Sequence, residues 1–222
     1  MQNTNDPSLL LTHYLQEAQI AITPAQIKLL AEYMDLLFKW NNVYNLTAAK
    51  TSEEFITDHI LDSLIVGPFL EGDNIIDVGS GAGLPGVVLA IYYPDKQFTL
   101  LESRGKKVRF LQAVITTLKL QNIAIVNQRA EQYHVDHLFN TVITRAFSSL
   151  KEMLQITQHL CHPKGLFLAM KGRLPLLELA QIEHDFTVTL EQRLIVPGMN
   201  KERHIIGVRH KENQGGKSSR DS

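Results

Sequence analysis

Apolar residues recur at helical spacing through roughly the first 70 positions, and this pattern predicts three helices. The stripe of the first helix consists of Leu9, Leu10, His13, Tyr14 and Glu17. The second helix begins after Thr23, whose hydroxyl can cap it, with Pro24 in its first turn. Its stripe consists of Ile27, Leu30, Ala31, Met34, Leu37 and Phe38. Residues 40–49 are rich in Asn and predict a loop, and a third helix is expected from Ser52 to about Val66.

The pattern changes at Asn74, where short apolar runs begin to alternate with helical stretches. The expected strands are residues 74–78, 97–102, 123–128, 141–144 and 166–170. The expected helices are residues 85–93, 105–119, 149–159 and 174–184. Alternation of this kind predicts an α/β fold with a mostly parallel, doubly wound sheet and right-handed crossovers.

The last third of the chain alternates apolar and polar residues in two runs, 186–196 and 203–209, around Pro197 and Gly198. This pattern predicts an antiparallel hairpin that closes the sheet. Residues 211–222 are dominated by Gly, Ser and charged side chains, so we expect disorder there. The predicted organisation is a helical extension over residues 1–70, an α/β domain over residues 71–210 and a disordered tail over residues 211–222.

Composition is that of an ordinary globular protein. Of 222 residues 44% are hydrophobic, and the formal net charge of −1 gives no global signature of nucleic-acid binding, so contact with RNA would need a local basic patch. The single cysteine, Cys161, rules out an internal disulfide and fits a reducing compartment. The N-terminus lacks the features of a secretory signal, and no apolar run reaches the about 18–20 residues that span a bilayer. We expect a soluble cytoplasmic protein without membrane contact.

The most informative segment is residues 77–86, with the sequence DVGSGAGLPG. An apolar strand runs into Gly79, Gly81 and Gly83, and a helix is expected directly after them. Glycines let the chain turn sharply and let a ligand lie against bare backbone. The free N–H groups at the start of the helix form a seat for an anion. The segment therefore predicts a ligand-binding turn.

Two kinds of cofactor use such a turn. The spacing of Gly81, Gly83 and Gly86 also fits the dinucleotide fingerprint, with Glu102 about 20 residues further on. The full pattern of an acid followed by alternate glycines favours S-adenosylmethionine. Asp77 would then meet the amino group of the methyl donor, directly or through water, and Glu102 would accept hydrogen bonds from the ribose hydroxyls. A nicotinamide-dependent oxidoreductase and a purely structural turn are the alternatives.

Further ligand contacts are expected where later strands end, because open α/β sheets bind ligands at the carboxyl ends of their strands. Ala130 and Glu131 follow the third strand, where the corresponding turn borders the adenine ring in this fold. Glu131 could equally be only a helix-starting acid. Arg145 follows the fourth strand and Lys171 the fifth, which makes both candidate catalytic residues. The alternative is that both are surface cations.

The turn after the fourth strand limits the methyl acceptor. Enzymes that methylate exocyclic amines of adenine or cytosine usually carry an Asn/Asp-Pro-Pro-aromatic turn there, whereas this chain has TRAF at 144–147. Enzymes that methylate carbon five of pyrimidines need a cysteine at the strand ends, and Cys161 fits a small core residue better. Guanine N7 is compatible, because its lone pair carries no proton and positioning alone can drive the attack. Arg145 and Lys171 would orient the base through O6 or a flanking phosphate.

Residues 104–109, RGKKVR, place four cations at the start of an expected helix. Basic charge there opposes the helix dipole, so the cluster is not explained by helix stability and could hold RNA phosphates. A solvated helix face is the alternative.

His59 and Asp62 lie one helical turn apart. Two ligands make no metal site, so we expect helix packing or RNA contact there and no metal.

Residues 77–86, with RAF at 145–147 and MKG at 170–172, closely resemble the glucose-inhibited division protein B family. The resemblance covers nearly the whole chain, including WN at 40–41, YNLT at 44–47 and HILDS at 59–63. It implies a Rossmann-like class I S-adenosylmethionine-dependent methyltransferase that methylates N7 of a guanine in bacterial 16S ribosomal RNA, in a loop near the decoding centre. By the same resemblance, Gly79 and Leu84 line the donor site, Ala130 and Glu131 border the adenine, and Arg145 lies beside donor and acceptor.

The resemblance also implies the partner. We expect 16S rRNA or the small ribosomal subunit as substrate, no DNA, and a monomeric enzyme. A non-catalytic RNA-binding protein with the same fold remains an alternative. Small-molecule or protein acceptors also stay open, and the near-neutral charge is the argument for them.

Overall fold

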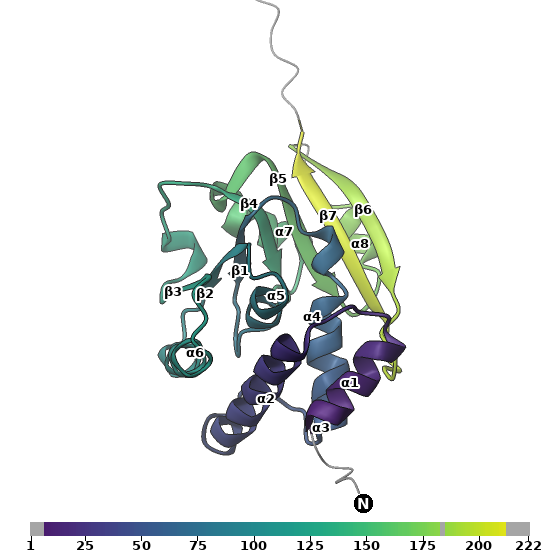
Figure 1. The fold of residues 1–222 in the computed structure, drawn as a ribbon. Coiled ribbons are helices and arrows are strands. Elements are labelled where there is room, and N and C mark those ends of the chain that lie inside the picture. The colour runs from purple at the N-terminus through teal and green to yellow at the C-terminus, as the bar shows by residue number, and fades with distance from the viewer. Residues whose placement is uncertain (1–6, 183–184, 212–222) are drawn as a thin grey trace, which may run out of the picture.

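Seven strands form one sheet in the order β3-β2-β1-β4-β5-β7-β6 (Figure 1). The computed structural model describes residues 7–182 and 185–211. The strands are β1 (Asn74–Val78), β2 (Gln97–Leu101), β3 (Ile123–Val126), β4 (Phe139–Thr144), β5 (Cys161–Lys171), β6 (Phe186–Leu194) and β7 (Arg203–His210). β1 to β5 pair in parallel, whereas β7 pairs antiparallel with both β5 and β6. The predicted parallel sheet with a closing hairpin is confirmed.

Helices cover both faces of this sheet. They are α1 (Pro7–Glu17), α2 (Pro24–Tyr44), α3 (Ser52–Phe55), α4 (Asp62–Leu64), α5 (Gly86–Tyr92), α6 (Gly105–Leu118), α7 (Leu150–Thr157) and α8 (Leu176–Leu179). Successive β1 residues show the two faces, since Ile75 packs in a cluster with Leu89 of α5, and Ile76 packs with Met153 of α7. The alternation follows from the two-residue period of a strand.

The N-terminal helices share a hydrophobic core with the rest of the domain. Leu30 and Met34 of α2 are fully buried in one cluster with Val87 of α5 and Leu111 of α6. The hydroxyl of Tyr33, also fully buried, donates a hydrogen bond of 2.7 Å to the carbonyl of Ala82 in the glycine turn. The predicted extension over residues 1–70 differs from the rest of the chain in its sequence pattern, but its described helices share one hydrophobic core with the sheet domain.

The first helix is rotated relative to the prediction, and only part of the predicted stripe faces the core. Leu11 and Leu15 are buried and the predicted Leu10 and Tyr14 pack against the same core, whereas His13 and Glu17 are exposed and Leu9 is about half exposed at 49%. The prediction was wrong for these last three residues because the short run LLL offers several overlapping periodicities, and packing against α2 selects one of them.

The second helix begins where predicted and ends later. Thr23 caps it through a capping box with Gln26, and Pro24 occupies the first turn. The helix continues through Tyr44 to a left-handed cap at Asn45, so the loop expected over residues 40–49 is confined to its second half. The third predicted helix is one helical run of three segments, in which a π-helix (Ile56–Leu61) separates α3 from α4.

The sequence prediction overestimated the last helix. Residues 174–184 were expected to form a helix, but α8 has four residues, and residues 183–184 lie outside the described ranges. Leu176 and Leu177 are 66% and 82% exposed, so their helical spacing does not reflect burial. Cys161 starts β5 rather than ending a helix, and it is buried as expected.

The predictions of a disordered tail and of no membrane span can be compared only with the residues that the structure describes. The disorder expected for residues 211–222 concerns a segment of which only residue 211 is described. Within residues 7–182 and 185–211, none of the helices combines the length and the apolar content needed to cross a bilayer.

Candidate active site

The glycine turn between β1 and α5 has backbone angles that favour glycine. Gly79, Gly81 and Gly83 have φ values of +73°, +60° and +93°. A Cβ on Gly79 would lie 2.7 Å from the Cβ of Ala146, and one on Gly83 would lie 2.4 Å from Cγ2 of Val87. Gly79 therefore lets the end of β4 approach the turn, and Gly83 lets the turn pack on its own helix.

Asp77, on β1, supports the glycine turn through a hydrogen bond to its end. Its side chain is fully buried, and Oδ2 accepts a 2.9 Å hydrogen bond from the N–H of Gly86 at the start of α5. Burial raises the pKa of this carboxyl to about 7. Asp77 lines neither of the two cavities beside the turn, so its contact with the amino group of a methyl donor stays a prediction.

Glu102 follows β2 and is bound by backbone N–H groups. Oε2 accepts from the N–H of Gly81 at 2.9 Å, and Oε1 accepts from the N–H of Arg104 at 2.8 Å. Its side chain is nearly buried, with one edge in a cavity. Because each carboxylate oxygen has a further lone pair, Glu102 can still accept hydrogen bonds from a ligand.

The first cavity, of about 180 Å³, lies between the ends of β1, β2 and β4. Its lining includes the apolar side chains of Leu101, Phe147 and Ile156, and also Glu102, Ala130 and Glu131. Ala130 is buried, and Glu131 is exposed at the rim. A cavity lined by apolar side chains and two carboxylates suits the ring and the hydroxyls of a nucleoside.

The second cavity, of about 320 Å³, lies on the other side of Gly79. It shares Gly79 and Ala146 with the first cavity, so the two adjoin at this point. Its other lining residues include Thr47, His59, Gly81, Leu84, Lys107 and Arg145. The predicted positions Gly79, Gly81 and Leu84 are thus brought together here, whereas Gly83 lines neither cavity.

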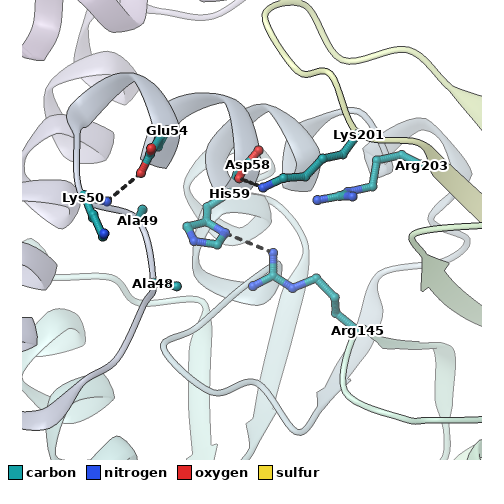
Figure 2. Close-up of a pocket in the computed structure, with 9 residues that line it drawn as sticks. All are labelled: Ala48, Ala49, Lys50, Glu54, Asp58, His59, Arg145, Lys201 and Arg203. Carbon is teal, nitrogen blue, oxygen red and sulfur yellow. Dashed lines mark hydrogen bonds and ion pairs between the residues drawn. The ribbon is translucent and has the colours of Figure 1, made fainter.

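The third cavity, of about 520 Å³, opens beyond Arg145 (Figure 2). It is lined by Ala48, Ala49, Lys50, Glu54, Asp58, His59, Arg145, Lys201 and Arg203. Arg145 and His59 also line the second cavity, so these two side chains stand at the boundary. Arg145 thus lines two neighbouring cavities, and its expected place beside donor and acceptor stays a prediction.

A buried carboxylate orients the arginines at this boundary. Asp62, only 1% exposed, accepts a 2.9 Å hydrogen bond from Nε of Arg203 and lies 3.5 Å from Nη1 of Arg145. Burial raises the pKa of Asp62, and the two arginines oppose that rise. Asp62 therefore fixes Arg145 and Arg203 relative to each other.

His59 connects the same cluster to the segment before α3. Its Nδ1 lies 3.4 Å from Nη1 of Arg145, and its Nε2 lies 2.7 Å from Oγ1 of Thr47. Burial lowers the pKa of His59 to about 4, and the nearby charge of Arg145 adds to this effect. The imidazole is neutral at pH 7 and acts as a hydrogen-bonding link.

Lys171 makes contacts other than those predicted. Its ammonium pairs with Glu178 at 2.9 Å and donates to the carbonyl oxygens of Phe147 and Ser148 at 3.5 and 3.4 Å. Lys171 lines none of the three cavities, and its side chain is only 12% exposed. The structure therefore attaches Lys171 to the loop after β4 and does not bring it to the boundary with Arg145.

Sequence reasoning missed several residues of the site. Lys107 was assigned only to a basic cluster, yet it lines the second cavity, 4.0 Å from Oε2 of Glu102. Lys201 and Arg203 were not considered, and Thr47 entered only within the YNLT run of the family resemblance, without a role in the site. A further signal was the pair His59 and Asp62, which share one helix face. Among residues 7–182 and 185–211 we find no cluster of three or more metal-ligating side chains.

Comparisons with known proteins agree with this geometry. A family model described as rRNA small subunit methyltransferase G matches residues 26–206. The chain is 47% identical over 199 residues to ribosomal RNA small subunit methyltransferase G of Salmonella agona, covering 90% of this chain and 96% of the relative. The protein of the same name in Salmonella paratyphi B is 46% identical over the same coverage.

Solved structures support the fold. An S-adenosylmethionine-dependent methyltransferase from Aquifex aeolicus aligns with a TM-score of 0.54 at 14% identity, covering 70% of this chain and 92% of that one. P. horikoshii TYW2 in complex with MeSAdo aligns with a TM-score of 0.53 at 10% identity, covering 68% and 62%. At these identities the likeness concerns the fold alone, and it is the class I methyltransferase fold that the sequence predicted.

Proposed function

Because the chain belongs to the rRNA small subunit methyltransferase G family, we propose that it transfers the methyl group of S-adenosylmethionine to N7 of a guanine in 16S ribosomal RNA. Family and fold make the chain an S-adenosylmethionine-dependent methyltransferase. The choice of the guanine base and of its N7 atom is the further step that we propose. The observation that carries it is the boundary at Arg145, where the second cavity, beside the glycine turn, meets the third cavity, which Lys50, Lys201 and Arg203 also line.

The residues beside the glycine turn fit the methyl donor. The first cavity would hold the adenosine, with the ribose hydroxyls on Glu102 and the adenine edge at Ala130 and Glu131. The amino-acid part would then lie across Gly79 in the second cavity, against Gly81 and Leu84. Support comes from the angles at Gly79 and Gly81, which bare the backbone between the two cavities.

Methyl transfer to guanine N7 asks for positioning and not for proton removal. When bound, S-adenosylmethionine supplies a methyl group on a positively charged sulfur. The N7 lone pair forms the new bond, the carbon–sulfur bond breaks, and the positive charge passes from sulfur to the base. Arg145 at the boundary can donate to O6 of the guanine through one N–H group, and this single contact leaves N7 free to attack the methyl group.

The third cavity fits a nucleotide better than a proton-transfer site. Of its two carboxylates, Glu54 accepts the backbone N–H of Lys50 at 2.7 Å, and Asp58 pairs with Lys201 at 2.5 Å. Both carboxylates are thus engaged, and the arginines are held by a buried acid. Arg203 and Lys50 present positive charge to a phosphate of the RNA backbone.

We assign Lys171 a supporting role. Its bonds to the carbonyl groups of Phe147 and Ser148 brace the loop that follows Arg145. Phe147 also lines the first cavity, so this brace acts on the donor side as well. Lys171 is therefore a positioning residue in this proposal, in place of the direct contact with the base that the sequence suggested.

The partner is the small ribosomal subunit or its free 16S rRNA, and we expect a monomeric enzyme that leaves DNA unmodified. The test is incubation with methyl-labelled S-adenosylmethionine and each RNA form, followed by nucleoside analysis. We expect label in 7-methylguanosine at a single site. DNA of the same sequence is the control for the polymer.

Three results would contradict the proposal. Label on another atom or base would remove the N7 assignment, and binding of RNA without label would favour a non-catalytic RNA-binding protein. Thermal stabilisation by NAD or NADP, but not by S-adenosylmethionine, would favour the oxidoreductase alternative, because a bound ligand stabilises the folded state.

A further inference from the structure

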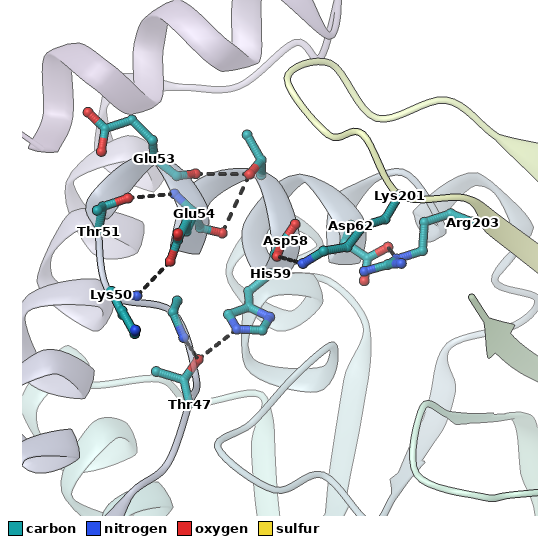
Figure 3. A network of polar contacts seen from close by, with 12 residues as sticks. Thr47, Lys50, Thr51, Glu53, Glu54, Asp58, His59, Asp62, Lys201 and Arg203 are labelled. Atoms are coloured by element: carbon teal, nitrogen blue, oxygen red, sulfur yellow. Dashed lines mark hydrogen bonds and ion pairs between the residues drawn. The ribbon is translucent and has the colours of Figure 1, made fainter. Parts of the chain in front are cut away.

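The segment between α2 and α3 is held by hydrogen bonds at both ends, and Figure 3 shows the bond between Lys50 and Glu54. The N–H of Thr47 donates to Oδ1 of Asn41 at 2.9 Å, and the N–H of Lys50 donates to Oε2 of Glu54 at 2.7 Å. These bonds fix the backbone on both sides of Ala48, at the wall of the second cavity. The position of the Thr47 side chain is therefore set before any ligand binds.

The direction of the Thr47 hydroxyl follows from its partners. Because a guanidinium has only donors, Nδ1 of His59 must accept from Arg145, and the neutral ring then carries its hydrogen on Nε2. That hydrogen is donated to Oγ1 of Thr47 at 2.7 Å, and the N–H of Ala49 donates to the same oxygen at 3.1 Å. Both lone pairs of the hydroxyl are occupied, so Thr47 can act toward a ligand only as a donor.

Lys107 lines the same cavity from α6. Its Nζ would lie 3.5 Å from a Cβ on Gly81 and is 4.0 Å from Oε2 of Glu102, beyond hydrogen-bond distance. The side chain is 28% exposed. A positive charge and an oriented hydroxyl donor thus line one cavity, and both are suited to an anion with two oxygens.

We propose that Thr47 and Lys107 form the subsite for the carboxylate of the methyl donor, an inference that rests on the proposed donor site. With the ribose on Glu102, the amino-acid part extends across Gly79 into the second cavity, where these two groups meet it. Arg145, engaged by Asp62 and His59, stays available to the acceptor. His59 is then a positioning residue, because it directs the Thr47 hydroxyl without touching the ligand.

The test compares two ligands that differ only in the carboxylate. Calorimetry measures the binding of S-adenosylmethionine and of decarboxylated S-adenosylmethionine to the full chain. We expect Thr47→Val to weaken S-adenosylmethionine about tenfold, as for a hydrogen bond to a charged group, and to leave the decarboxylated ligand unchanged. Thr47→Ser keeps the hydroxyl and should bind as the unsubstituted chain does. Thr12→Val, which removes a hydroxyl bonded within α1, is the matched control.

Lys107→Gln provides a second variant, at a partly exposed position. It should show the same ligand selectivity as Thr47→Val. If both variants weaken the two ligands equally, or neither ligand, the subsite is overturned while the donor site stands. If the unsubstituted chain fails to bind S-adenosylmethionine at all, the proposed donor site fails together with the subsite.

Discussion

The proposed donor and acceptor sides of the candidate active site are built in different ways. The proposed donor side is one continuous turn, residues 77–86, in which glycine angles bare the backbone and the N–H groups of Gly81 and Gly86 bind the carboxylates of Glu102 and Asp77. The proposed acceptor side is assembled from three segments that lie far apart in sequence, namely residues 48–62, Arg145 and residues 201–203, and the buried Asp62 pairs with Arg145 and Arg203. The shape of the donor side depends on glycines, which have no side chain, whereas the shape of the acceptor side depends on ion pairs between charged side chains.

This difference has a consequence for the effects of substitutions. On the donor side, an added side chain collides with fixed backbone or with a neighbouring strand end. On the acceptor side, removal of one charged group releases its partners, since Asp62 holds both Arg145 and Arg203. Substitutions should therefore separate donor affinity from the rate of methyl transfer.

The largest effect is expected at the boundary. Arg145→Ala should lower the rate of rRNA methylation about a hundredfold, because the base loses its orientation, while the affinity for S-adenosylmethionine falls much less. Single-turnover methylation and calorimetry measure the two quantities. Arg193→Ala removes an exposed arginine on β6 that lines none of the three cavities, and it should change neither. Full activity of Arg145→Ala would reject its acceptor role.

Gly79→Ala should act on the donor side with the opposite selectivity. The new Cβ would lie 2.7 Å from the Cβ of Ala146, and the φ of +73° would cost about 1–3 kcal/mol in backbone strain. The added methyl group would also stand where the first two cavities adjoin. We expect the affinity for S-adenosylmethionine to fall at least about tenfold. Gly105→Ala is the control, since nothing lies within 4 Å of its added Cβ. Equal affinity in both variants would show that the ligand does not cross Gly79.

Glu102→Ala tests the ribose contact. The change leaves the N–H groups of Gly81 and Arg104 without their acceptor and removes the acceptor proposed for the ribose hydroxyls. Calorimetry should show donor affinity lowered by about tenfold. Glu191→Ala, at an exposed position on β6, controls for loss of charge. Unchanged affinity would remove the ribose role of Glu102.

The smallest effects are in the pH dependence of stability, where the two sides have opposite signs. The pKa of His59 falls from 6.5 to about 4 on folding, so the unfolded chain binds the extra proton and stability rises with pH between these values. The pKa of Asp77 rises from 3.8 to about 7, so the folded chain binds the extra proton and stability falls with pH over that range.

His59→Asn should therefore make the slope of unfolding free energy against pH more negative, and Asp77→Asn should make it more positive. Each change is at most about 1.4 kcal/mol per pH unit between about pH 5 and 6, as for one proton. Urea denaturation across this range measures both slopes. Equal slopes in the two variants would contradict the assigned pKa shifts.

The donor side could be predicted from sequence because its determinants are consecutive. The strand at 74–78, the alternate glycines and the following helix all lie in one window, and the structure confirms these elements there. Glu102 ends the next strand, so its place beside the turn followed from the parallel order of β1 and β2. Local spacing was sufficient for this half.

The acceptor side could not be predicted in the same way. Asp62 at the start of α4 binds Arg203 at the start of β7, and the spacing of these two residues in sequence says nothing about this contact. Lys171 and Arg145 both follow the end of a strand, so the sequence offered no reason to distinguish them, yet Lys171 forms an ion pair with Glu178 of α8. Ion pairing of distant charges decides such cases, and single-sequence patterns do not report it.

The hydrogen bond from Tyr33 of α2 to the carbonyl of Ala82 makes the glycine turn, and with it the proposed cofactor site, depend on an N-terminal helix. Because a buried phenol loses its partner at a high energetic cost, the glycine turn keeps its shape only while α2 remains docked. A chain shortened to begin at β1 would retain every glycine of the turn and lose the support that shapes it. Modularity in the sequence pattern is thus no guide to where this enzyme can be cut.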